Sequence, residues 1–188
     1  RDEEAARFVM RDGQKELRME WETGMWEYWD YEKSRKDPDP DAIPSDDEVA
    51  RIAAEFLKEN GWLPDDFRLQ AVTHLTEGTG FSAPITIGKV AYFYRYIGDV
   101  PVLGVSRIGV QVGENGEIIS IFKFFKDIEP AGNMSLKTVA AAYDEVKSGN
   151  AVVRTDNPNV TKAAIQDVKL YYWEDAGSIS DQPYPQAS

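Results

Sequence analysis

The chain has 188 residues, a formal net charge of −12 and no cysteine. This length is enough to bury a hydrophobic core in one domain or in two small ones. The negative charge disfavours nucleic acid and anionic membrane surfaces as partners, because both repel an acidic protein. The lack of cysteine excludes disulfides, thiolate nucleophiles and cysteine metal ligands.

No apolar run approaches the roughly 20 residues that a transmembrane helix needs. The sequence begins at Arg1 rather than at a methionine. We therefore expect that a signal peptide or membrane anchor has been removed upstream, and that the protein acts outside the cytoplasm, secreted or anchored to a membrane.

The N-terminal segment predicts a short helix followed by a hairpin. Residues 2–5 (DEEA) are acidic enough to begin a helix that ends before Gly13. Two strand-like runs, 17–21 and 25–31, then flank a turn at Glu22-Thr23-Gly24.

The second run of this hairpin, MWEYWDY, carries aromatic residues on both faces. Trp26 and Tyr28 point to one side and Trp29 to the other. The commoner outcome is a strand sandwiched between layers of a core. The alternative is an exposed aromatic surface that binds a ligand or a partner. We take Trp26, Tyr28 and Trp29, with Tyr92 and Tyr94 further along, as the candidate partner-binding residues.

Residues 34–44 (SRKDPDPDAIP) predict a linker that contains an incomplete calcium-loop pattern. The carboxylates of Asp37, Asp39, Asp41 and Glu48 match the acidic positions of an EF-hand loop. Alanine occupies the position where glycine makes the sharp turn, and Glu48 forms a capping box with Ser45. We therefore expect no metal site, and these four residues are the only weak candidates for one.

Residues 46–60 predict an amphipathic helix that ends at Gly61. Its apolar stripe consists of Val49, Ile52, Ala53, Phe56 and Leu57. The next run, 67–76, predicts a strand that contains His74, the single histidine of the chain. A histidine on a strand face is the more common case, and a general base is the alternative.

Two catalytic or cofactor motifs match only in part. Residues 78–83 read GTGFSA, as in a dinucleotide fingerprint, but strand-like residues follow where the fingerprint needs a helix. Gly104-Val105-Ser106 begins a nucleophile elbow that lacks its second glycine. We expect no cofactor and no catalytic residues.

Residues 90–125 predict the centre of the fold. Three apolar, β-prone runs are separated by turn residues, and the middle run places Ile108, Val110 and Val112 on one face. The loop at residues 113–116 (GENG) joins this run to the next as an antiparallel hairpin.

The C-terminal part predicts one more helix and one more strand. Ser135 caps a helix that ends before Gly149, and residues 168–173 (VKLYYW) form the strand. The helix stripe contains Leu136, Val139, Ala140, Tyr143 and Val146.

These elements together predict an α+β fold, with two main helices packed on one face of a mainly antiparallel sheet. The expected division is an N-terminal segment with the aromatic hairpin (1–36), a linker (37–44) and an α+β domain (45–188). The last of these divides into two similar helix-plus-sheet units, 45–130 and 131–188.

The run GDVPVLGVSRIGVQVGENGEIISIFKFF resembles the hairpin of the PepSY group and related extracytoplasmic regulators. MSLKTVAAAYDEVKSGN followed by IQDVKLYYWED is similar to the closing helix–strand unit of accessory proteins that control membrane sensor kinases. The likeness covers roughly residues 45–175. It implies an α+β domain outside the cytoplasmic membrane that binds or inhibits proteins, with no catalytic residues.

Three functions follow as hypotheses. The first is a non-catalytic, regulatory or inhibitory extracytoplasmic domain that binds a protein partner or a cell-envelope ligand. The second is a hydrolase that uses two carboxylates. The third is a small-molecule carrier whose aromatic pocket is lined by Tyr92, Phe93, Tyr94, Tyr96 and Trp173. A concave aromatic cavity favours the third, and a buried acid pair in a cleft favours the second.

Overall fold

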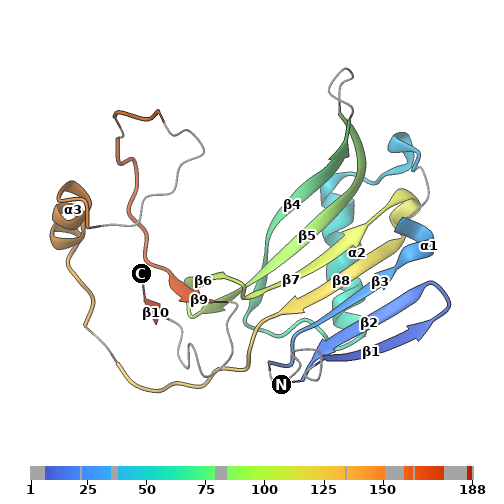
Figure 1. Cartoon of the computed structure of the whole chain (residues 1–188), viewed down its shortest axis with the longest axis horizontal. Helices are drawn as coiled ribbons and strands as arrows, with labels where there is room; N and C mark the ends of the chain where they lie inside the picture. Colours follow the sequence, from blue (N-terminus) through green and yellow to red (C-terminus); the bar gives the residue numbers. More distant parts are fainter. Residues whose placement is uncertain are drawn as a thin grey trace.

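The computed structural model describes residues 7–21, 23–34, 38–78, 84–133, 135–150, 159–162, 164–175 and 186–187. Within these residues, ten strands belong to one hydrogen-bonded sheet, shown in Figure 1. The helical elements of this part of the chain are few and short, and only one of them packs extensively on the sheet.

The main body of the sheet is antiparallel, in the order β1-β2-β3-β8-β7-β5-β4. It places the aromatic hairpin beside the central hairpin, because β3 pairs with β8. The bounds are β1 (Arg7–Asp12), β2 (Lys15–Glu20), β3 (Trp26–Asp30), β4 (Phe67–Glu77), β5 (Ile85–Ile97), β7 (Arg107–Val112) and β8 (Ile118–Phe124).

Three further strands extend the sheet at the end of β5. β6 (Val100–Gly104) forms a hairpin with β5, and β9 (Tyr172–Glu174) pairs with β6 in parallel. β10 (Gln186–Ala187) pairs with β9. The sheet is therefore mixed, and the parallel pair joins two segments far apart in the sequence.

Helix α2 (Asp46–Glu59) confirms the helix predicted at 46–60. It begins at Ser45, whose Oγ accepts a hydrogen bond from the Glu48 amide. Val49, Ala53 and Leu57 of its stripe are fully buried against the sheet, whereas Ile52 and Phe56 are partly buried. The core of the domain lies between this helix and the sheet, with the residues Val49, Ala53, Leu57, Phe67, Ala91, Phe93, Ile108, Val110, Val112, Ile121 and Phe125.

The predicted fold class, two main helices on one face of an α+β domain, is wrong. The structure is dominated by a curled, mixed sheet with short helices. Helix α3 (Val139–Lys147) has no buried residue, and its Val139 and Tyr143 are 66% and 48% exposed. The chain leaves β8 as an extended segment that carries α3 away from the sheet (Figure 1), while α2 packs on β4, β5 and β7.

Smaller differences concern the two ends of the chain. Residues 7–12 form strand β1 rather than the expected helix, because this run pairs along its whole length with β2 through the turn at Gly13. The helix predicted from Ser135 begins later, after Thr138, and the predicted strand at 168–173 is reduced to β9.

The expected linker contains one short helical turn, the 3-10 turn η2 (Pro40–Ala42), and a short helix α1 (Tyr31–Ser34) precedes the linker directly after β3. Residues 35–37 lie outside the described part. The hairpins at 17–31 and 107–125 are confirmed, the second turning through the 3-10 turn η3 (Glu114–Gly116).

Candidate functional site

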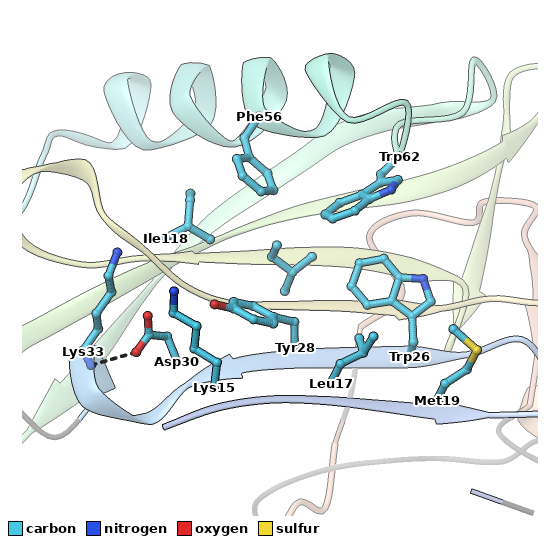
Figure 2. A pocket seen from close by; sticks show the side chains of 11 residues that line it. Lys15, Leu17, Met19, Trp26, Tyr28, Asp30, Lys33, Phe56, Trp62 and Ile118 are labelled. Atoms are coloured by element: carbon cyan, nitrogen blue, oxygen red, sulfur yellow. Dashed lines mark hydrogen bonds between the residues drawn. The ribbon is translucent and has the colours of Figure 1, made fainter. Parts of the chain in front are cut away.

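One face of the sheet is only partly covered by a helix. Helix α2 contacts β4, β5 and β7, and the floor formed by β8, β3 and β2 continues beyond it. On this floor lies an open groove of about 610 Å³. Figure 2 shows the side chains that line it. Its lining is mostly apolar: Lys15, Leu17, Met19, Trp26, Tyr28, Asp30, Lys33, Phe56, Trp62, Ile118 and Ile121.

Strand register explains why these side chains share a face. Met19 pairs with Trp26, and Leu17 pairs with Tyr28, which in turn pairs with Ile121 on β8. Directly paired residues in an antiparallel sheet point to the same side, so three strands contribute one apolar row each. The period-two pattern of the aromatic hairpin thereby becomes the floor of the groove.

The wall of the groove comes from the end of α2. Gly61 adopts a left-handed conformation (φ +67°), and the Trp62 amide donates to the Leu57 carbonyl at 2.8 Å, which completes a Schellman motif. This turn brings the Trp62 ring edge-on to Trp26, with ring centroids 5.2 Å apart, and 5.8 Å from Phe56. Trp62 stays 41% exposed, so the aromatic wall remains accessible.

One end of the groove is polar. Lys15 and Lys33 lie there beside Asp30, and the Tyr28 hydroxyl points toward the same end (Figure 2). The Asp30 carboxylate is buried and accepts a hydrogen bond from the Lys33 amide at 3.2 Å. Burial of the ring, and then the negative charge of Asp30, raise the pKa of Tyr28, so its hydroxyl stays a hydrogen-bond donor at neutral pH.

The structure separates the five predicted partner-binding residues. Trp26 and Tyr28 line the groove. Trp29 lies on the opposite face of β3 and stacks on Tyr31. Tyr92 is also on the opposite face, where its ring packs 5.8 Å from that of Phe122, and Tyr94 alternates with buried Phe93 on the same strand.

The alternative pocket proposed for a carrier is not formed by the residues predicted for it. Phe93 is 2% exposed and points into the core, whereas Tyr92, Tyr94 and Tyr96 leave the other face of β5. Tyr96 donates to Gln70, and Trp173 donates from its ring nitrogen to Asp175. The concave aromatic surface instead uses Phe56 and Trp62, which were not among the predicted site residues.

The carboxylates considered for calcium binding have local partners. Asp39 accepts a hydrogen bond from the Asp41 amide and caps the turn η2, and Glu48 pairs with Arg51. Asp37 lies outside the described residues. Within the described part of the chain, no three histidine or acidic side chains are grouped so that they could hold a metal ion.

The buried acids do not resemble a general acid–base pair. Glu16 accepts hydrogen bonds from Arg11 and Arg18 on the face opposite the groove, and the Arg11 bond is the main reason why the pKa of Glu16 is lowered. A carboxylate held charged in this way is a poor proton donor. Buried Glu174 accepts from the Lys126 amide, in the region of β9.

His74 lies at the far end of α2, where it joins an ion cluster. Its Nε2 lies 2.8 Å from the Asp46 carboxylate, and the Lys89 ammonium lies 2.7 Å from the same oxygen. Asp46 opens the first turn of α2, so the cluster ties the helix to β4 and β5. Lys89, and then His74, lower the pKa of Asp46 below its ordinary value of 3.8.

Acidification should therefore remove a stabilising contribution of Asp46. A carboxylate with a lowered pKa in the folded state stabilises the fold above its unfolded pKa, and this contribution is lost as the pH falls through the folded pKa. We expect the difference in melting temperature between the parent and Asp46→Asn to shrink as the pH falls from about 6 to about 3. Thermal melts followed by circular dichroism would measure this, and a difference independent of pH would contradict it.

Comparison of the chain with protein-family models, with curated proteins and with solved structures gives no match. The resemblance to PepSY-type domains therefore stays a prediction. None of the helices in the described residues is both long enough and apolar enough to cross a bilayer.

Proposed function

We propose that the chain is a non-catalytic binding domain whose ligand site is the groove between α2 and the β2–β3 hairpin. The observation that carries this proposal is the size and lining of the groove: about 610 Å³, floored by Leu17, Met19 and Tyr28 and walled by Trp62. Ligand sites are typically concave, mostly apolar and fitted with a few polar groups at one end. Trp and Tyr are also the side chains that most often anchor binding partners.

A concave aromatic groove is the feature that favours the third hypothesis drawn from the sequence, a small-molecule carrier. The apolar face, however, extends over four strands to the exposed Phe8 and Met10 of β1, and this width favours the protein partner of the first hypothesis. The resemblance to extracytoplasmic regulators adds the expectation that binding takes place outside the cytoplasmic membrane. The apolar groove supports binding, and the low pKa of Glu16 argues against that residue as a proton donor.

The groove should bind an apolar probe, and a charge placed in the groove should weaken that binding. We expect anilinonaphthalene sulfonate to fluoresce strongly with the parent protein, and Met19→Glu to weaken its binding by about tenfold or more, since a buried unpaired carboxylate is costly. Met19 lines the groove on β2. Fluorescence titration measures the effect, and thermal melts show that the variant is folded.

The matched control is Val9→Glu. Val9 lies on the adjacent strand β1 and pairs with Arg18, so it faces the side opposite the groove. Its replacement should leave probe binding unchanged. Equal loss in both variants, or no fluorescence with the parent, would show that the groove is not a binding site.

A further inference from the structure

The apolar surface of the groove continues onto the edge of the sheet. Phe8 pairs with Met19 and Met10 pairs with Leu17, so both β1 side chains share the face of the groove. They are 51% and 54% exposed, respectively. The uncovered face thus runs across four strands, from β8 to β1.

The dimensions of this face match a helix. Neighbouring strands lie about 4.8 Å apart, so four strands span about 14 Å between the first and the last. An α-helix with its side chains is about 10–12 Å across. A second helix can therefore lie beside α2 on the same face of the sheet, against Phe56 and Trp62. A single acyl chain would leave much of so wide a face exposed.

Backbone pairing favours a helix over an extended peptide. β3 is paired with β2 on one edge and with β8 on the other, and β2 is paired with β1. The floor of the groove therefore offers no free backbone groups for an added strand, and among the described strands around it an extended peptide would find unpaired strand groups only at the outer edge of β1, beside the groove. An extended peptide lying there would bury N–H and C=O groups without partners, whereas a helix pairs its own.

The polar end of the groove favours an anionic group on the occupant, because two ammonium groups and one buried carboxylate line it. Lys15 has no ion-pair partner within the described part of the chain, and Lys33 has a long contact of 3.8 Å to Glu117. The Lys33 and Glu117 side chains are 32% and 40% exposed, so this pair is weak and can exchange. The Asp30 carboxylate is buried beside them and accepts a hydrogen bond from the Lys33 backbone amide. Two ammonium groups thus remain available to an anionic group.

We propose that the occupant is an amphipathic α-helix of a protein partner, with its apolar stripe on the four-strand face and an acidic side chain at the Lys15–Lys33 end. This inference rests on the proposed binding function and names its ligand class. The stripe would present residues at helical spacing, as in other helix-in-groove complexes.

The probe for this proposal is a fluorescein-labelled peptide of about 15 residues, long enough to cross the face as a helix. Its leucines recur at helical spacing and two glutamates lie at one end. A control peptide has the same composition with the leucines spread around the helix. We expect the parent protein to bind the patterned peptide at least about tenfold more tightly, measured by fluorescence anisotropy.

Charge reversal tests the polar end. Lys15→Glu with Lys33→Glu should weaken binding by about tenfold or more, and a peptide with lysines in place of its two glutamates should restore it. The matched control is Lys58→Glu with Lys147→Glu, because both lysines are exposed and neither lines the groove. This control should change binding by less than about twofold.

Equal binding of both peptides would overturn the helix as the occupant. Displacement of anilinonaphthalene sulfonate from the groove by dodecanoate, but not by the patterned peptide, would also overturn it. Self-association of the chain that Met19→Glu abolishes would also overturn it, in favour of a second copy. If anilinonaphthalene sulfonate binds in the groove but the patterned peptide does not, the helix proposal fails and the binding function stands. If neither binds, the binding function itself fails.

Discussion

Leu57→Ala should lower the free energy of unfolding by about 2–5 kcal/mol, because it empties space at the centre of the core. Leu57 is fully buried between α2 and the sheet, together with Val49 and Ala53. Leu57 has no exposed surface and packs among other buried side chains, so its neighbours can only partly fill the cavity. Urea unfolding followed by circular dichroism measures the change.

The matched control is Phe56→Ala, at the preceding position of the same helix. Phe56 is only partly buried and lines the groove, so its replacement should cost clearly less stability than Leu57→Ala, while weakening probe binding. If Phe56→Ala destabilised the protein as much as Leu57→Ala, the groove would be part of a closed core, and the binding proposal would lose its basis.

Gly109→Ala should also destabilise the protein, by about 1–3 kcal/mol, because the added methyl group overpacks the opposite face of the sheet. Gly109 on β7 pairs with Phe122 on β8, and the Phe122 ring lies directly over it, so that a Cβ would overlap the ring. The ring cannot easily move aside, because it also packs against Tyr92 and Phe124.

Two variants check this explanation. Gly88→Ala adds the same methyl group on neighbouring β5, where the nearest atom, the Val112 carbonyl oxygen, is at an ordinary distance of 3.4 Å. It should change stability by less than about 0.5 kcal/mol. Phe122→Leu should reduce the cost of Gly109→Ala in a double-mutant cycle. Strictly additive effects would mean that contact with the ring is not the cause.

The sequence predicted the elements whose signals are local. Ser45 and Glu48 mark the start of α2 and Gly61 marks its end, and the structure has a helix between them. The hairpin turn at residues 113–116 supplies the positive φ angles that Asn115 and Gly116 adopt. In both cases a few neighbouring residues determine the backbone, so no tertiary information is needed.

The arrangement of these elements depended on distant contacts. The stripe of α3 has the same spacing as that of α2, and periodicity alone does not tell whether a sheet face is within reach. For the same reason Phe56 and Leu57 looked equivalent, although one lines the groove and the other is in the core. Trp62 could have been found, since an apolar residue after a C-terminal glycine often packs back on its helix.

The parallel pairing of β9 with β6 has a consequence for the order of folding. It joins Val102 to Tyr172 and Leu103 to Trp173, whereas β7 and β8 are joined through a turn of a few residues. Closing the chain between β6 and β9 costs conformational entropy, and the few contacts of this short pairing form only after that cost has been met. We therefore expect β9 to associate last and to detach first. The residues that line the groove all precede Phe122. Local opening at β9 should therefore leave the groove intact, which makes the C-terminal region and the proposed site separate cooperative units.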